Sequence, residues 1–328
     1  MINPSPLVAG LPRHAGVVRP LAGMLLALAI LTISPVPASR AAADAPLTIS
    51  VSILPLADFT RQVGGDAVAV QVLVPPGADV HAYDLRPSQM QTLQRSRLLI
   101  LNGLDLEPFA GKLRALMERR RIPVLEAGAG LAPMPATEDD HEDEAGHGDE
   151  DGHGDGHGHG GVDPHVWLDP QLAILQVARI RDALSALDPA RAEAFTRRAT
   201  DYMHALQALD AQYRNALRDA PVRRFIAYHG GYGHLAARYG LEQIPVLQGD
   251  SLGGPSAARV AEIITLARRE GLGTIFAEPQ FSRRAVTALA QEAGLRVSTL
   301  DALGTTPDST YIAMMTRNLE QLREALFP

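Results

Sequence analysis

Residues 188–217 read "DPARAEAFTRRATDYMHALQALDAQYRNAL". Asp188 and Pro189 suit the start of a helix, because aspartate is favoured at the N-cap and proline at the first helical position. Apolar side chains then recur at helical spacing, at Phe195, Tyr202, Met203, Leu206, Leu209, Tyr213 and Leu217. A helix over residues 189–218 would be about 45 Å long at 1.5 Å per residue. We expect it to join the parts of the chain on either side rigidly.

Both flanks of this helix alternate short apolar runs with helical patterns. The runs before it are "LTISVSI", "VAVQVLV", "RLLILNG" and "IPVLEAG", and those after it are "RFIAY", "IPVLQ", "GTIFAE" and "RVSTL". This alternation is typical of parallel sheets with helical crossovers. The sequence therefore predicts an α/β protein with two Rossmann-like lobes, residues 44–188 and 219–328, each with a parallel sheet.

The N-terminal stretch has the pattern of a secretory signal peptide. Arg13 and Arg19 precede the apolar run "LAGMLLALAILTIS", which is followed by small residues. The run is too short to cross a bilayer comfortably. We expect residues 1–43 to be a signal peptide that is cleaved within Ala41 to Ala43, and the mature protein to be soluble in the periplasm. A retained membrane anchor is the alternative.

The amino-acid composition limits which partners and which metal ligands this chain can have. The net charge is −7, but residues 138–159 hold ten acidic residues and no basic ones. The remaining chain has 30 basic residues against 27 acidic ones, so the acidity is local and a nucleic-acid partner has no support. The chain has no cysteine. Disulfides and a lipid-anchored cysteine are thereby excluded, and a metal site would need histidine and carboxylate ligands.

Residues 136–162 are rich in glycine, acid and histidine and have almost no apolar side chains. Such a segment cannot bury enough surface to offset its ordering entropy, so we expect a disordered loop inserted late in the first lobe. Its histidines would be weak auxiliary metal sites that act as a collector or sensor, because each binding event must order the loop. A solubilising spacer is the alternative interpretation. The histidines are His141, His147, His153, His157 and His159.

Five metal-capable residues lie where parallel strands should end. His81 follows "VAVQVLV" and His229 follows "RFIAY", while Glu278 and Asp301 follow "GTIFA" and "RVSTL". His165 lies in "DPHVWLDP", just after the insert. Because ligands of open α/β sheets bind outside the carboxyl ends of the strands, the sequence predicts a metal site in the cleft between the lobes.

Three imidazoles and one carboxylate make a four-coordinate site that suits zinc, whereas manganese prefers more oxygen ligands. We expect Asp301 to be the fourth ligand; Glu278 is either the alternative ligand or a residue that supports the ligands from just outside the set. Each ligating imidazole also needs a partner for its second nitrogen. The nearby candidates are Asp79, Asp84, Asp163 and Asp169, although Asp169 precedes Pro170 and also fits a helix N-cap.

Several phrases together resemble one known family. They are "GADVHAYDLRPSQM", "DPHVWLDP", "DPARAEAF", "AYHGGYGHLAARYGL", "IFAEPQFS" and "LDALG". The chain resembles the ZnuA-type periplasmic zinc-binding proteins of ABC importers, within the wider zinc and manganese solute-binding family. This resemblance implies one metal bound between two similar lobes by His81, His165, His229 and Asp301. Manganese-selective members look to have glutamate at the position of His229, so the histidine favours zinc. Gly230 departs from the acidic residue that relatives often have there.

The predicted function is capture of periplasmic Zn²⁺ and its delivery to an ABC permease in the inner membrane. The chain has no phosphate-binding glycine-rich lysine motif, so nucleotide hydrolysis would belong to a partner. We expect a monomer that is not an enzyme. The alternatives are a manganese-binding homologue, a periplasmic zinc hydrolase, for which no "HExxH" phrase is present, and an adhesin or metal buffer. Whether a periplasmic metallochaperone loads the site stays open.

Overall fold

A computed structural model describes residues 45–131, 134, 162–247, 255–306 and 309–328. The predicted signal peptide and almost all of the predicted loop lie outside these residues, as do the five histidines of that loop. Residues 44–328 form one compact unit. No helix in the described part of the chain is both long and apolar enough to cross a bilayer.

The first lobe has a four-stranded parallel sheet in the order β2-β1-β3-β4. Its elements are β1 (Leu47–Val51), α2 (Leu54–Gly64), β2 (Val68–Val72), the 3₁₀ turn η2 (Val80–Ala82), α3 (Pro87–Leu93), β3 (Leu98–Leu101), α4 (Ala110–Arg120) and β4 (Val124–Glu126). The 3₁₀ turn η1 (Gly65–Ala67) links α2 to β2. After the insert come the 3₁₀ turn η3 (Val166–Leu168) and helix α5 (Pro170–Leu187).

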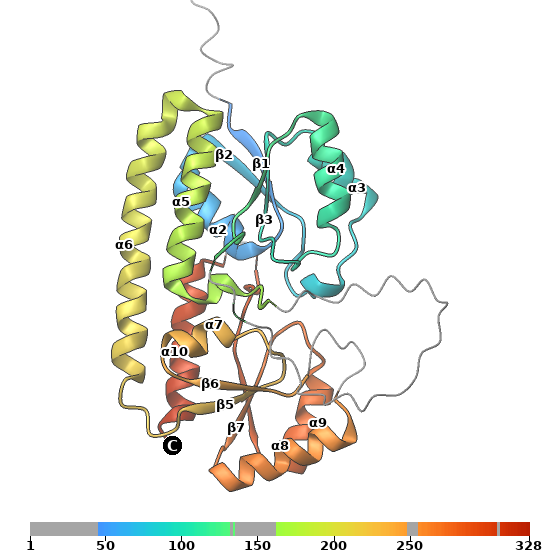
Figure 1. Cartoon of the computed structure of the whole chain (residues 1–328), viewed down its shortest axis with the longest axis vertical. Coiled ribbons are helices and arrows are strands. Elements are labelled where there is room, and N and C mark those ends of the chain that lie inside the picture. The colour runs from blue at the N-terminus through green and yellow to red at the C-terminus, as the bar shows by residue number, and fades with distance from the viewer. Residues whose placement is uncertain (1–44, 132–133, 135–161, 248–254, 307–308) are drawn as a thin grey trace, which may run out of the picture. The chain divides into compact units, whose positions relative to one another are not determined.

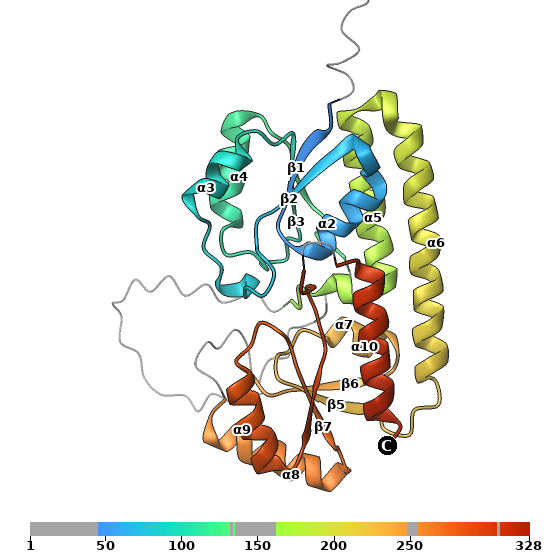
Figure 2. The ribbon, with the colours of Figure 1, turned by 180° about the vertical axis from the view of Figure 1, so that it is seen from behind.

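The second lobe repeats this order, with a parallel sheet β6-β5-β7-β8. Its elements are β5 (Arg224–Ala227), α7 (Gly233–Arg238), β6 (Glu242–Pro245), α8 (Ala257–Glu270), β7 (Thr274–Ala277), α9 (Arg283–Ala293), β8 (Arg296–Thr299) and α10 (Tyr311–Leu326). The prediction of two parallel-sheet α/β lobes is confirmed (Figures 1 and 2).

Helix α6 (Ala192–Leu217) runs past both sheets and packs along α5 (Figure 1). Its 26 residues correspond to about 39 Å, which is shorter than predicted. The predicted start at Asp188 is wrong, because Pro189–Arg191 form a separate 3₁₀ turn. The Asp188 carboxylate makes no capping hydrogen bond and instead pairs with Arg191 at 2.8 Å.

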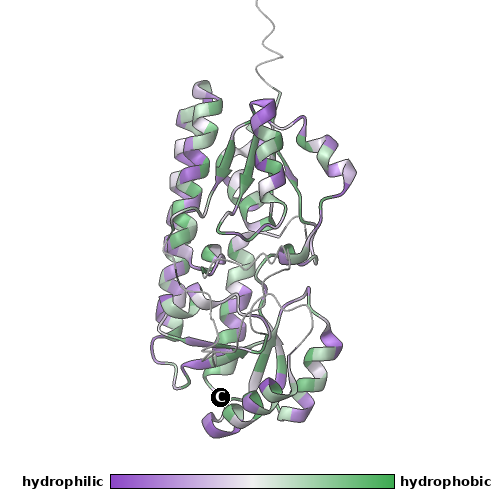
Figure 3. Ribbon diagram, turned by 45° about the vertical axis from the view of Figure 1, so that its right-hand side comes forward, coloured by the Kyte–Doolittle hydropathy of each residue, from purple (hydrophilic) through white to green (hydrophobic). Residues whose placement is uncertain are grey.

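A second helix crosses between the lobes. The C-terminal helix α10 packs against α6, α2 and β5 (Figure 2). Side chains of both sheets and of α5, α6 and α10 share one buried apolar cluster, and Figure 3 shows the apolar residues concentrated in the strands of both lobes. The sequence predicted one connecting helix, α6; in the described part of the chain α10 also packs against elements of both lobes.

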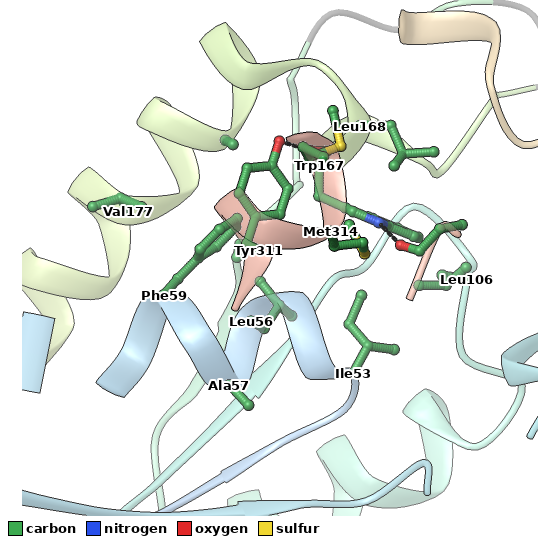
Figure 4. Close-up of a cluster of buried hydrophobic side chains, with 14 of the residues drawn as sticks. Ile53, Leu56, Ala57, Phe59, Leu106, Trp167, Leu168, Val177, Tyr311 and Met314 are labelled. Atoms are coloured by element: carbon green, nitrogen blue, oxygen red, sulfur yellow. Dashed lines mark hydrogen bonds between the residues drawn. The ribbon is translucent and has the colours of Figure 1, made fainter. Parts of the chain in front are cut away.

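One part of this shared core joins side chains of α2 and α5 to the start of α10 (Figure 4). Trp167, the only tryptophan, is fully buried and donates its indole N–H to the carbonyl oxygen of Ala302 at 2.7 Å. The hydroxyl of Tyr311 donates to the carbonyl oxygen of Trp167 at 2.6 Å. These hydrogen bonds tie the loop before α5 to the second lobe.

Candidate metal centre

Three histidines from distant segments meet at the junction of the lobes. His81 lies in η2 after β2, His165 immediately precedes η3, and His229 follows β5. One ring nitrogen of each lies within 4.8 Å of the others. Sequence reasoning placed these residues at the carboxyl ends of strands or just after the insert, and the fold brings them to one point.

The spacing of the imidazoles fits a single small cation. The Nε2 atoms of His81 and His165 are 3.2 Å apart, and the three ring centroids lie 5.0 to 5.3 Å from one another. Two nitrogens that bind one tetrahedral zinc at 2.0 to 2.1 Å are separated by about 3.3 Å. Since His165 and His229 are buried, a cation held here would be largely removed from water.

Asp163 is the partner of His165. One oxygen of Asp163 accepts hydrogen bonds from the main-chain N–H of His165 at 2.9 Å and from its ring Nδ1 at 2.8 Å. Nδ1 therefore carries a proton and Nε2 is left with a lone pair for a metal. Burial raises the pKa of Asp163, but the hydrogen bond from His165 and the charges of His165 and His234 bring it below its usual value.

Glu278 has the same relation to His229, whose Nδ1 donates to a Glu278 oxygen at 2.9 Å. Burial, the largest influence, lowers the pKa of His229, but the hydrogen bond and charge of Glu278, with the charges of Asp79 and Asp163, raise it above its usual value. Negatively charged carboxylates thus surround the imidazoles, and their charge favours a cation between the three rings.

Asp301, the predicted fourth ligand, is buried nearby but lies outside the group of donor atoms within 4.8 Å, and so does Glu278. One Asp301 oxygen accepts the main-chain N–H groups of Leu303 and Gly304 at 3.1 and 2.8 Å. Burial, together with the charge of Glu278, raises the pKa of Asp301. A nearby cation would relieve that cost, but the identity of the fourth ligand stays a prediction.

The other candidate partners have different roles. Asp169 caps α5 by accepting the main-chain N–H of Gln171 at 2.8 Å, and its second oxygen pairs with Arg238 of the second lobe. Asp79 accepts the main-chain N–H of His81 at 3.0 Å, and Asp84 is exposed. The helix-cap interpretation of Asp169 is therefore confirmed.

Two supporting residues escaped sequence reasoning. Gln243 in β6 accepts the main-chain N–H of Tyr232 and donates to the carbonyl oxygen of His229 at 2.9 Å. Asn102, directly after β3, donates to the carbonyl oxygen of Pro164 at 2.9 Å. Both are buried polar residues, and Asn102 could have been singled out by its position after an apolar strand.

Comparison with known proteins supports a zinc-binding fold. Residues 49–325 match the family described as "Zinc-uptake complex component A periplasmic", ZnuA. The zinc-binding lipoprotein AdcA of Streptococcus pneumoniae is 30% identical over 288 residues, covering 86% of this chain and 56% of the relative. The high-affinity zinc uptake system protein ZnuA of Bacillus subtilis is 28% identical, covering 85% of this chain and 88% of the relative. The chain thus spans about half the length of the AdcA relatives it matches.

Solved structures have the same fold. A zinc-bound ZnuA deletion mutant matches with a TM-score of 0.74 at 28% identity, covering 86% of this chain and 99% of that one. Zn(II)-bound AdcA from Streptococcus pneumoniae matches with a TM-score of 0.71 at 28% identity, covering 86% of this chain and 58% of that one. With the family match extending over most of its length, the chain belongs to the ZnuA family of periplasmic zinc-uptake components.

Proposed function

We propose that this chain binds Zn²⁺ between its lobes and supplies it to an ABC permease. His81, His165 and His229 would be three ligands, and Asp301 the fourth. The observation that carries the proposal is the convergence of three imidazole nitrogens within 4.8 Å. Two of these rings donate the Nδ1–H group to a buried carboxylate, as metal-bound histidines do in proteins.

The donor set supports zinc over manganese. Three nitrogen ligands suit zinc, whereas manganese favours carboxylate, carbonyl and water oxygens. The relatives described above are named for zinc binding or zinc uptake, and the matching solved structures include zinc-bound ones. None of these names describes a catalysed reaction, so a binding protein is favoured over a zinc hydrolase.

We also propose the arrangement of the whole chain: a signal peptide at residues 1–43, a first lobe at 44–188, a linker segment at 189–218 that contains helix α6, and a second lobe at 219–328. The mature chain would act in the periplasm, where its family is described. The His-rich segment within residues 136–162 would add weaker zinc sites.

Metal content is the first test. Protein purified from periplasm without added metal should contain zinc in preference to manganese. In competition with a chelator, His229→Ala should lower zinc affinity by orders of magnitude, because three ligands cannot replace four. His204→Ala, at an exposed histidine of α6, is the matched control. Equal affinity of the wild-type and His229→Ala chains would contradict the ligand set.

Delivery needs a cellular test. A strain that lacks this chain and any second zinc importer should grow poorly under zinc starvation. The wild-type chain should restore growth and the His229→Ala chain should not. Unimpaired growth of the deletion strain would count against transport and favour an adhesin or a metal buffer.

A further inference from the structure

His234 is a fourth histidine near the candidate centre, and the ligand set leaves it unused. It lies in α7 of the second lobe and is only 3% exposed. Sequence reasoning gave it no role at the site. Burying a histidine is costly unless its polar atoms are hydrogen-bonded, so its contacts show what it does.

The ring of His234 reaches across to the first lobe. Its Nε2 lies 3.0 Å from the main-chain oxygen of Asp163. Because a carbonyl oxygen can only accept, Nε2 must carry the proton and donate it. Asp163 in turn accepts both hydrogen bonds from His165. Asp163 is therefore bonded through its main-chain oxygen to His234 and through its carboxylate to a candidate ligand, His165.

The backbone beside His234 is also pressed against Asp163. A Cβ atom added to Gly233 would lie 2.6 Å from a carboxylate oxygen of Asp163, so only glycine allows this approach. Residues 233 and 234 thus contact both the carboxylate and the main-chain oxygen of Asp163. The first turn of α7 therefore packs against the turn before His165.

Each of the two carbonyls before His165 is held by a side chain from a different lobe. Asn102 of the first lobe donates to the carbonyl oxygen of Pro164 at 2.9 Å, and His234 of the second lobe donates to that of Asp163. Fixing both carbonyls restricts the backbone just before His165. Without the hydrogen bond from His234, the main-chain oxygen of Asp163 would lose its donor from the second lobe. The turn before His165 would then be held only by Asn102 of the first lobe and by packing against α7.

We propose that His234 is a positioning residue that, by its hydrogen bond to Asp163, holds His165 in line with His81 and His229 for metal binding. This inference rests on the proposed zinc-binding function. It means that the second lobe supplies His229 and the proposed ligand Asp301 directly and also orients a ligand of the first lobe. A metal site supported in this way depends on the two lobes keeping their relative position.

The test compares three substitutions in the full chain. His234→Phe removes the donor and keeps a ring of similar size. His234→Gln restores a donor at the position of Nε2, and His234→Asn carries the same amide on a side chain too short to reach the Asp163 oxygen. His204→Phe, at the exposed histidine of α6, controls for loss of a histidine elsewhere. Zinc affinity is measured by chelator competition, and the visible absorption of bound Co²⁺ reports ligand geometry.

We expect His234→Phe and His234→Asn to weaken zinc binding about 10- to 100-fold, the usual effect of losing an outer partner of a metal site. Both should also alter the Co²⁺ spectrum, while His234→Gln should recover most of the affinity and the wild-type spectrum. If His234→Phe fails to fold, the Gln and Asn variants still test the proposal, because they carry the same amide group and differ only in side-chain length.

Other results would overturn the inference. Equal zinc affinity and equal Co²⁺ spectra in the Gln and Asn variants would show that the hydrogen bond does not position His165. A loss of thermal stability in His234→Phe with unchanged affinity and spectrum would reduce His234 to a packing residue. Failure of the wild-type chain itself to bind zinc would instead overturn the proposed function, so the two failures are distinguishable.

Discussion

Two of the candidate ligands differ from ordinary surface histidines because their second ring nitrogen is hydrogen-bonded to a buried carboxylate. His165 donates to Asp163 and His229 donates to Glu278, and both carboxylates are buried. Such a pair fixes the tautomer that leaves Nε2 free, and it makes the imidazole a better donor to a cation. The same negative charge also favours protonation, so zinc and protons compete for these rings.

The competition predicts a pH dependence of zinc affinity. The pKa of His229 is raised above its usual value of about 6.5. Because a protonated imidazole cannot bind metal, zinc affinity should be constant above this raised pKa and should fall as the pH drops through it. The stability of the zinc-free protein depends on pH in the opposite direction. Because the pKa of His229 is higher in the folded than in the unfolded state, His229 stabilises the fold at pH values below its unfolded-state pKa, and this contribution is lost as the pH rises through the folded-state pKa. Chelator competition at a series of pH values measures the first effect.

Substitution of Glu278 tests whether its charge is what raises the pKa of His229. Glu278→Gln removes the charge that raises the pKa of His229, so the fall in affinity should move to lower pH. At high pH the variant should bind zinc about 10- to 100-fold more weakly. Glu292→Gln, at an exposed position on α9, should change neither property. A profile for Glu278→Gln that superimposes on the wild type would refute this assignment.

At this scale the sequence predicted which histidines would meet, because parallel topology sends the carboxyl ends of strands to one edge of a sheet. It left the partners of these histidines open. Asp163 is close to His165 in sequence and was one of four candidates, but Glu278 is 49 residues from His229. That pairing depends on the neighbouring positions of β5 and β7, which only the folded sheet defines.

Among the elements, α10 packs on the second sheet and is also hydrogen-bonded to helices α2 and α6. Its first residue, Tyr311, donates its main-chain N–H to Asp58 of α2 at 2.9 Å, and the hydroxyl of Tyr202 in α6 donates to the same oxygen at 2.8 Å. Tyr213 of α6 also donates its hydroxyl to the carbonyl oxygen of Met315 in α10 at 2.6 Å. A buried carboxylate at the start of α10 satisfies an unpaired N–H and interacts favourably with the helix dipole.

This network predicts a large effect of a single substitution far from the metal site. Asp58→Ala should lower the free energy of unfolding by about 3 kcal/mol, because it leaves the buried donors of Tyr202 and Tyr311 without an acceptor. Asp66→Ala, at an exposed position shortly after the same helix, should have little effect. Urea denaturation of the zinc-free proteins compares them, and equal stability of the two variants would contradict the role given to Asp58.

The helix boundaries show where a sequence pattern stops being informative. The apolar spacing from Phe195 to Leu217 predicted α6 well, since the same face packs on α5 and α10. The Asp-Pro pair at residue 188 failed as a start signal because Asp188 pairs with Arg191 and ends the preceding helix through its main-chain N–H. The contact between α10 and α2 joins residues more than 250 positions apart, which local patterns cannot indicate.

For the whole molecule, the shared apolar cluster makes the two lobes one structural unit. We expect the zinc-free chain to unfold in one cooperative transition, and zinc to shift it upward as a single step. At a free zinc concentration 1,000 times the dissociation constant, the stabilisation should be about 4 kcal/mol. Calorimetry and the fluorescence of Trp167, whose ring lies 5.2 Å from that of His165, should report the same midpoint. Two separate transitions would show that the lobes unfold independently.

The last prediction separates the candidate centre from the His-rich segment. The candidate ligands described above occupy defined positions in the fold, whereas the five histidines between residues 141 and 159 stand among glycine and acid in the sequence. Deleting residues 138–161 should therefore lower the number of zinc ions bound and leave the affinity of the tightest site nearly unchanged. His229→Ala should do the reverse, removing the tight site and keeping the weaker ones. Calorimetric titration of both variants gives stoichiometry and affinity together, and equal losses in the two would refute this division of labour.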